Sequence, residues 1–106
     1  MNVRITGLRQ IYGIPFISKN EIAEQMGLTE KTIRNRMNEI EQQKERYGEY
    51  ATIRDGGIVM INYLVWVDYL HFRQRLMQKN AKKFVPPYNP AKVAREIGWY
   101  EVGEVI

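Results

Sequence analysis

Residues 18–46 read SKNEIAEQMGLTEKTIRNRMNEIEQQKER, and the core of the expected fold follows from them. Ser18 and Glu21 have the spacing of a capping box, which predicts a helix that begins directly after Ser18. Gly27 is suited to end that helix, because a residue without a Cβ adopts the left-handed backbone of a helix stop at little cost. Thr29 carries the hydroxyl oxygen of an N-cap, which predicts the start of a second helix. The stretch therefore predicts two helices joined by a tight turn.

Each predicted helix has one apolar face at helical spacing. The face of the first helix is expected to bury Ile22, Ala23 and Met26. The face of the second follows the spacing i, i+4, i+7 and is expected to bury Ile33, Met37 and Ile40. We expect the second helix to continue to a stop at Tyr47-Gly48. The two apolar faces are then expected to pack against each other.

The opposite face of the second helix carries amides and cations. At about 100° per residue, this face consists of Lys31, Asn35, Asn38 and Gln42, with Arg34 on its flank. In the major groove, Asn and Gln pair with adenine, whereas Arg and Lys pair with guanine. The face therefore has the chemistry that reads base edges in DNA. The alternative is an ordinary solvated helix face.

Two β-prone runs follow the second helix. Residues 50–54 and 58–61 are β-branched or apolar, and residues 55–57 between them read Asp-Gly-Gly, a hairpin turn signal. A hairpin directly after such a helix is what a winged helix requires. Arg54 near the tip is expected to reach a phosphate or the adjacent minor groove. Alternatively, the hairpin only covers the core and Arg54 is simply solvated.

A longer helix is expected over residues 63–79, with Asn62 as its cap. Its apolar stripe is expected to consist of Trp66, Leu70, Arg73 and Met77, with Tyr69 and Leu76 beside it. The apolar surface is wider than one neighbour covers, because Val65 and Phe72 extend it. We expect this surface to receive the C-terminal segment, because the Pro-Pro pair at 86–87 redirects the chain. A dimer face is the alternative.

The ends of the chain give weaker signals. Asn89 followed by Pro90 reads as a cap and first helical residue, which predicts a short helix that closes at Gly98. Near the N-terminus, glycine and proline breaks forbid a long helix. We expect one short helix or extended piece over residues 6–12, packed under the helix pair.

Composition narrows the class of protein. The 106 residues are expected to form a single domain, with a winged helix-turn-helix core over 18–70 and a C-terminal helical extension over 71–106. The fold class is thus mainly α with a small β-hairpin. Without Cys, with one His (His71) and with one Ser (Ser18, explained as a cap), no nucleophile pair or metal cluster can be assembled. We therefore expect neither an enzyme nor a cofactor.

No apolar run reaches the roughly 18 residues of a membrane span, and the N-terminus lacks the shape of a signal peptide. A cytoplasmic protein without a membrane partner is expected. The formal charge of +4 is unevenly placed, because residues 71–95 hold seven basic residues and no acidic ones. The rest of the chain keeps 9 basic residues against 12 acidic ones. Lys82 and Lys83 in the basic segment are expected to contact phosphates, and a solvated basic face is the alternative.

Residues 20–33, 53–61 and 68–70 together resemble the excisionase family of phages and mobile elements. The shared features are the first helix, the Gly-Leu-Thr turn, the Thr-Ile-Arg start of the second helix and the Arg-Asp-Gly-Gly wing. Residues 38–50 form a longer and more charged link than is usual in that family. The resemblance implies a winged helix that binds double-stranded DNA beside an attachment site and works with an integrase.

Three functions stay open. An excisionase is the first, a phage transcriptional repressor with the same fold is the second, and a winged helix that docks on a recombinase or host protein without touching DNA is the third. The last is motivated by the acidic cluster of Glu39, Glu41, Glu45 and Glu49, which would repel phosphate. A homodimer and a cooperative assembly on DNA are both compatible with the sequence.

DNA binding is the function that we expect. Thr29 and Thr32 would serve phosphates near the helix N-terminus, while Lys31, Arg34 and Asn35 would read bases. The complete set of expected DNA contacts is Thr29, Lys31, Thr32, Arg34, Asn35, Asn38, Arg54, Lys82 and Lys83.

Overall fold

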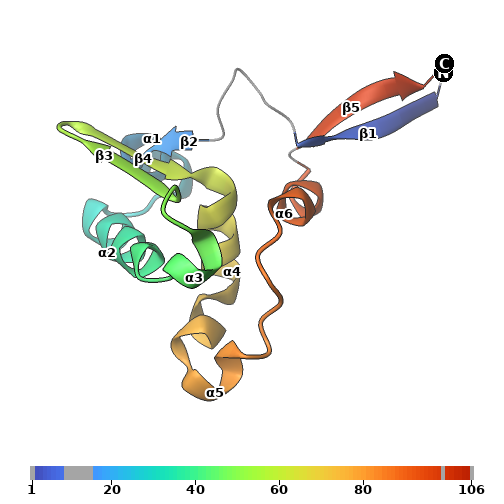
Figure 1. Cartoon of the computed structure of the whole chain (residues 1–106). Helices are drawn as coiled ribbons and strands as arrows, with labels where there is room; N and C mark the ends of the chain where they lie inside the picture. The colour runs from blue at the N-terminus through green and yellow to red at the C-terminus, as the bar shows by residue number, and fades with distance from the viewer. Residues whose placement is uncertain (1, 9–15, 99, 106) are drawn as a thin grey trace.

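The structure, a computed structural model, describes residues 2–8, 16–98 and 100–105, and it describes side chains for residues 16–98. In chain order the elements are β1 (Asn2–Leu8), β2 (Phe16–Ser18), α1 (Lys19–Met26), α2 (Glu30–Glu41), α3 (Lys44–Tyr47), β3 (Thr52–Asp55), β4 (Ile58–Asn62), α4 (Tyr63–Met77), α5 (Lys79–Lys82), α6 (Pro90–Glu96) and β5 (Tyr100–Val105). The fold is mainly helical, with a small antiparallel sheet beside α1 and α2 (Figure 1). This confirms the prediction that the chain is mainly helical and contains a small β-hairpin.

The caps of α1 and α2 are those that the sequence predicts. The Ser18 hydroxyl accepts a hydrogen bond of 3.1 Å from the backbone N–H of Glu21. Gly27 has φ of +66°, the left-handed conformation in which a Cβ is unfavourable. Thr29 accepts a hydrogen bond of 3.2 Å from the backbone N–H of Thr32 and caps α2. These local signals confirm two helices joined by a short turn.

The core forms where α1 and α2 meet α4. Seven of its side chains are at most 1% exposed, namely Ile22, Ile33, Met37, Ile40, Trp66, Tyr69 and, from β4, Ile61. The predicted seam of α2 is therefore confirmed. Met26 was expected in the core but is 39% exposed, because it ends α1 at the rim of the helix pair. Its sulfur instead accepts a hydrogen bond of 3.2 Å from the indole N–H of Trp66.

The second helix is shorter than predicted. α2 ends at Glu41, and Gln43 leaves the helical conformation with φ of −96° and ψ of 47° before α3 begins. The turn directs Arg46 and Tyr47 toward the buried carboxylate of Asp68 in α4, which accepts hydrogen bonds from both side chains. A continuous helix up to Tyr47 was therefore a wrong prediction, because a tertiary contact outweighs helix propensity here.

The sheet contains one strand more than predicted. β3 and β4 form the expected hairpin, although β3 begins at Thr52 rather than at Tyr50, whose side chain is exposed. On its other edge β4 pairs with β2, in the order β2-β4-β3. A strand of only three residues carries little signal of its own, and it exists because β4 offers it a free edge.

α4 begins at the predicted cap, where the Asn62 side chain accepts from two backbone N–H groups, but it ends at Met77 instead of residue 79. Its buried stripe is rotated by about one residue from the prediction. Leu70 and Met77 are 37% and 59% exposed, whereas the buried positions of α4 are Leu64, Val65, Trp66, Asp68, Tyr69 and Leu76. The rotation brings both the sheet and the C-terminal segment onto α4.

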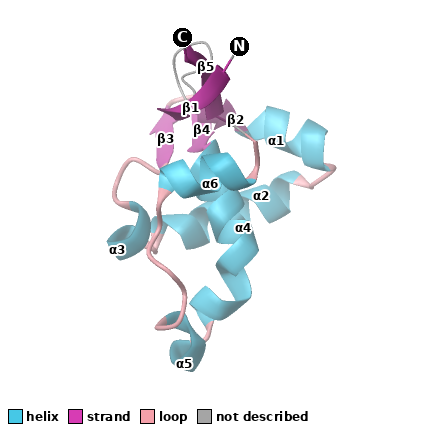
Figure 2. Ribbon diagram, turned by 90° about the vertical axis from the view of Figure 1, so that its right-hand side faces the viewer, coloured by secondary structure: helices cyan, strands magenta, loops and turns pink. Residues whose placement is uncertain are grey.

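The C-terminal segment folds back over α4, as predicted. Val85 and Tyr88 pack on the core, and Arg46 Nη1 donates to the backbone oxygen of Pro86 at 2.6 Å. The Asn89 side chain caps α6 by accepting from the backbone N–H of Lys92. Figure 2 shows α6 beside α4. Burial beside the Asp68 carboxylate raises the pKa of Tyr88 to about 12, chiefly through desolvation.

The first strand lies in another place than predicted. β1 pairs with β5 in a separate antiparallel sheet, with Asn2 opposite Val105 and Leu8 opposite Tyr100. Figure 1 shows this sheet away from the α1–α2 pair. The expected packing under the helix pair is therefore wrong for residues 6–8, because strand pairing at the other end satisfies their backbone. Residues 9–12 of that prediction lie outside the described residues.

Candidate nucleic-acid interface

The face of α2 opposite the core is open to solvent. Lys31, Arg34, Asn35 and Asn38 are all exposed, as the helical spacing predicts. Within residues 16–98, no hydrogen bond or ion pair holds the side chains of Lys31, Arg34 or Asn35. The structure therefore brings two cations and an amide together on one helical face, free to meet a ligand.

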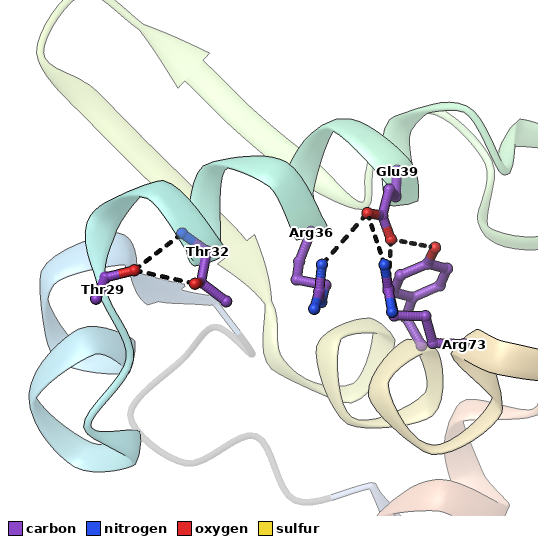
Figure 3. Close-up of polar contacts among 6 residues, drawn as sticks. Thr29, Thr32, Arg36, Glu39 and Arg73 are labelled. Atoms are coloured by element: carbon purple, nitrogen blue, oxygen red, sulfur yellow. Dashed lines mark hydrogen bonds and ion pairs between the residues drawn. The ribbon is translucent and has the colours of Figure 1, made fainter.

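The N-terminus of α2 lies next to this face. The Thr29 hydroxyl accepts from the backbone N–H of Thr32 and donates to the Thr32 hydroxyl at 2.9 Å (Figure 3). Thr29 is exposed and Thr32 is half-buried. The partial positive charge of a helix N-terminus favours an anion here.

Sequence reasoning missed an ion pair at this helix end. Lys19 Nζ lies 2.9 Å from Glu30 Oε1. The hydrogen bond and charge of Lys19 lower the pKa of the Glu30 carboxyl below its ordinary value. Lys19 thus offsets the one acidic side chain in the first turn of α2. The sequence gives no sign of the pair, because the two residues belong to different helices.

Glu39 belongs to the acidic cluster of the sequence, but its carboxylate is paired with side chains of α2 and α4. It accepts hydrogen bonds from Arg73 at 2.7 and 3.2 Å, from the Tyr69 hydroxyl at 2.7 Å and from Arg36 at 3.4 Å (Figure 3). These contacts, with Arg73 first, lower the pKa of the Glu39 carboxyl. Burial, and then Glu39, raise the pKa of Tyr69 far above its ordinary value. Glu39 therefore joins α2 to α4.

Glu41 has a similar role on the side of the hairpin. Its two carboxylate oxygens accept from Arg54 at 2.9 and 3.0 Å, and Oε2 also accepts from the Thr52 hydroxyl at 2.9 Å. Arg54 further donates to the side-chain oxygen of Asn38 at 3.3 Å. The hydrogen bond from Arg54 is the main cause of a lowered pKa of Glu41. Arg54, expected at a phosphate, thus lies against α2 and contacts another predicted site residue.

The predicted phosphate contacts Lys82 and Lys83 lie in a different part of the molecule. Both are exposed, at the end of α5 and just after it. Lys82 lines a surface depression with Glu41, Gln42 and Glu45, beside the end of α2. Arg73 is the only residue of the basic segment 71–95 that takes part in a described ion pair. The remaining cations of that segment therefore leave a positive surface.

Neither a metal-binding cluster nor a membrane-spanning helix is found in the part of the chain that the structure describes. There, no group of three or more His, Asp or Glu residues is placed to hold a metal ion. No helix of that part has the length and apolar character needed to cross a membrane.

Comparisons with known proteins add nothing to the site: no protein-family model, curated protein or solved structure matches the chain. The resemblance to excisionases stays a prediction.

Proposed function

We propose that this protein binds double-stranded DNA in a sequence-dependent manner, with α2 in the major groove and the β3–β4 hairpin as the wing of a winged helix. The observation that carries the proposal is the exposed set of Lys31, Arg34 and Asn35. Their side chains have no hydrogen-bond or ion-pair partner within residues 16–98, and the opposite side of the helix is buried. Cations and amides of this kind read base edges.

The positions of the acidic residues near α2 weaken the argument for a protein partner. Glu39 and Glu41 already have Arg73 and Arg54 as partners, so their charges are offset within the molecule. Glu45 and Glu49 lie on α3 and after it, beyond the end of α2. An α2 that enters the groove with its N-terminal part keeps these two carboxylates away from the bases.

The biological role that we propose is that of an excisionase, and it rests on the sequence resemblance. An excisionase would bind beside an attachment site and act together with an integrase. A transcriptional repressor would use the same surface of α2 on a promoter. Footprinting on the DNA that flanks the gene separates the two roles, because protection falls either beside an attachment site or across a promoter.

DNA binding itself is tested by selection from a library of random duplexes, followed by anisotropy titrations between 50 and 200 mM salt. We expect an enriched sequence and an affinity that falls steeply with salt. Asn35→Ala should weaken the preference, whereas Gln74→Ala, which removes an exposed amide from α4, should keep it. Failure to retain any duplex at low salt would overturn the proposal. Recovery of a recombinase by the chain would then favour the docking function.

A further inference from the structure

Four polar residues connect the hairpin to the exposed face of α2. Thr52 and Arg54 on β3 donate to the Glu41 carboxylate, and Arg54 Nη2 also donates to Asn38 Oδ1. Arg54 meets Glu41 with two N–H groups, one on each oxygen, which is the geometry that holds a guanidinium most firmly. Arg54 is thus fixed next to a residue of the candidate DNA-reading face.

This contact determines how the Asn38 amide is turned. A guanidinium has donors and no acceptor, so the atom of Asn38 that faces Arg54 must be the carbonyl oxygen. The Asn38 NH2 group then points away from the cation. An Asn that recognises adenine must offer its oxygen to the adenine amino group and its NH2 to adenine N7. Asn38 shares that oxygen with Arg54, whereas the oxygen of Asn35 has no hydrogen-bond partner within the described side chains.

We propose that Glu41 is a specificity-determining residue: it holds Arg54 against α2, makes Asn38 a hydrogen-bond donor in the groove, and keeps Arg54 off the phosphates. The inference rests on the proposed DNA binding by α2. As a donor, Asn38 selects base edges with acceptors, such as guanine O6 and N7 or thymine O4. Glu41 touches no base and acts as a positioning residue.

The second part of the inference concerns the affinity for duplex DNA that does not depend on base sequence. Arg54 lies one residue before the end of β3, and its side chain is 43% exposed. An unpaired arginine at this position would extend to a phosphate and strengthen binding to every duplex. Glu41 offsets its charge, because the carboxylate is ionised at neutral pH and the hydrogen bond from Arg54 lowers its pKa further. The pair therefore lowers non-specific binding while it shapes specific binding.

The decisive variant is Glu41→Gln, measured on the selected duplex and on random duplex at several salt concentrations. We expect affinity for random duplex to rise about three- to tenfold, and the slope of log affinity against log salt to steepen by about one to two units. Selection with this variant should also enrich duplexes that have adenine at the base pair contacted by Asn38. Glu45→Gln, which removes the same charge from an exposed residue of α3, should leave the preferred sequence unchanged.

The double variant Glu41→Gln with Arg54→Ala separates release of Arg54 from removal of a repulsive carboxylate. We expect it to lose the gain in random-duplex affinity, because the released cation is absent. If the gain persists, Glu41 only repels DNA and the inference is overturned. It is also overturned if Glu41→Gln binds random duplex like wild type and selects the same sequence. Absence of any DNA binding by the wild type would instead refute the proposed function.

Discussion

The two halves of α2 differ in how their polar side chains are used. In residues 30–35, Lys31, Arg34 and Asn35 have no hydrogen bond or ion pair within the described side chains. In residues 36–41, every polar side chain is bonded: Glu39 bonds Arg73 of α4 and also accepts from Arg36 within α2, and Asn38 and Glu41 bond Arg54 of β3. The second half, which we call the fastened half, therefore joins α2 to α4 and to β3. In the first half, Glu30 and Thr32 are bonded to Lys19 and Thr29, whereas Lys31, Arg34 and Asn35 stay available.

This division also places the side chains of Lys31, Arg34 and Asn35 where the binding of an anion is favourable. They lie near the N-terminus of α2, whose partial positive charge attracts phosphate, and not near its C-terminus. The acidic residues of α2 lie mainly in the fastened half, where arginines offset them. The comparison therefore predicts that substitutions in the two halves have different consequences. In the first half they should reduce DNA recognition. In the second half they should reduce stability, and Glu41 should in addition affect specificity through Arg54 and Asn38.

The largest effect is expected from the seam that both halves share. Met37 is fully buried between α1, α2 and α4, so Met37→Ala leaves a cavity and should cost about 2–5 kcal/mol of unfolding free energy. Urea denaturation followed by circular dichroism measures the loss. Lys31→Ala is the control, because an exposed residue of the same helix should change stability by less than about 0.5 kcal/mol. Equal stability of both variants would contradict the assigned core.

The next largest effect is expected in residues 30–35 of α2, the available half, whose side chains Lys31, Arg34 and Asn35 have no partner within the described side chains. Asn35→Ala should reduce discrimination between the selected site and random duplex by about 1–3 kcal/mol, because a base contact made by its amide is lost. Its unfolding free energy should stay near the wild-type value, since Asn35 is exposed. Competition titrations give the first quantity and denaturation the second. A variant that loses stability but not discrimination would reverse the roles assigned to the two halves.

Much of this comparison was predictable from local sequence signals. Side chains that bond backbone groups two or three residues away mark the helix starts at Ser18, Thr29, Asn62 and Asn89. Helical periodicity predicted both the buried seam and the open face of α2. Such signals work because their physical causes lie within one helical turn.

The contacts that fasten the second half could not be predicted in the same way. Glu39 bonds Arg73 across 34 positions of sequence, and Glu41 bonds Arg54 across 13. Nothing in the sequence of one element fixes which carboxylate meets which cation in another. For the same reason, the break after α2 depends on Asp68, far along the chain, and was missed. Charge patterns predicted an exposed face of cations and amides on α2, but they did not reveal that Glu39 and Glu41 are paired with arginines.

A smaller effect is expected at the contact between the fastened half and α4. Glu39→Gln weakens the hydrogen bonds to Arg73 and Tyr69, and it should cost about 1 kcal/mol near neutral pH, because the pair is only partly exposed. The Glu39 pKa is lowered in the folded protein from an ordinary value of 4.5. Its contribution to stability is therefore fully present above pH 4.5 and is lost as the pH falls through the lowered value.

Denaturation of wild type and Glu39→Gln between pH 2 and 7 tests this sign. The difference in unfolding free energy should shrink only below about pH 4.5. Glu24→Gln on α1, an exposed acid for which the described contacts include no hydrogen bond or ion pair, provides the baseline. A difference that grows as the pH falls would mean that Glu39 is destabilising as a charged group.

The smallest effect is expected at Lys82, which lies beside the end of the fastened half and extends the comparison beyond α2 itself. If the positive surface near Lys82 contacts the DNA backbone, Lys82→Ala removes one phosphate contact. Affinity for specific and random duplex should then fall alike, by about threefold, and the salt slope should flatten by about one unit. Discrimination between sites should not change, because a phosphate carries no sequence information.

Lys92→Ala, which removes the same charge from α6, is the matched control for Lys82→Ala. A larger loss at Lys82 would mean that the backbone of the bound duplex continues past the end of α2 toward α5. An equal, small loss in both variants would mean that the basic segment attracts DNA only through its overall charge. No loss in either would confine the interface to the available half of α2 and the hairpin, and Lys82 and Lys83 would no longer belong to the proposed site.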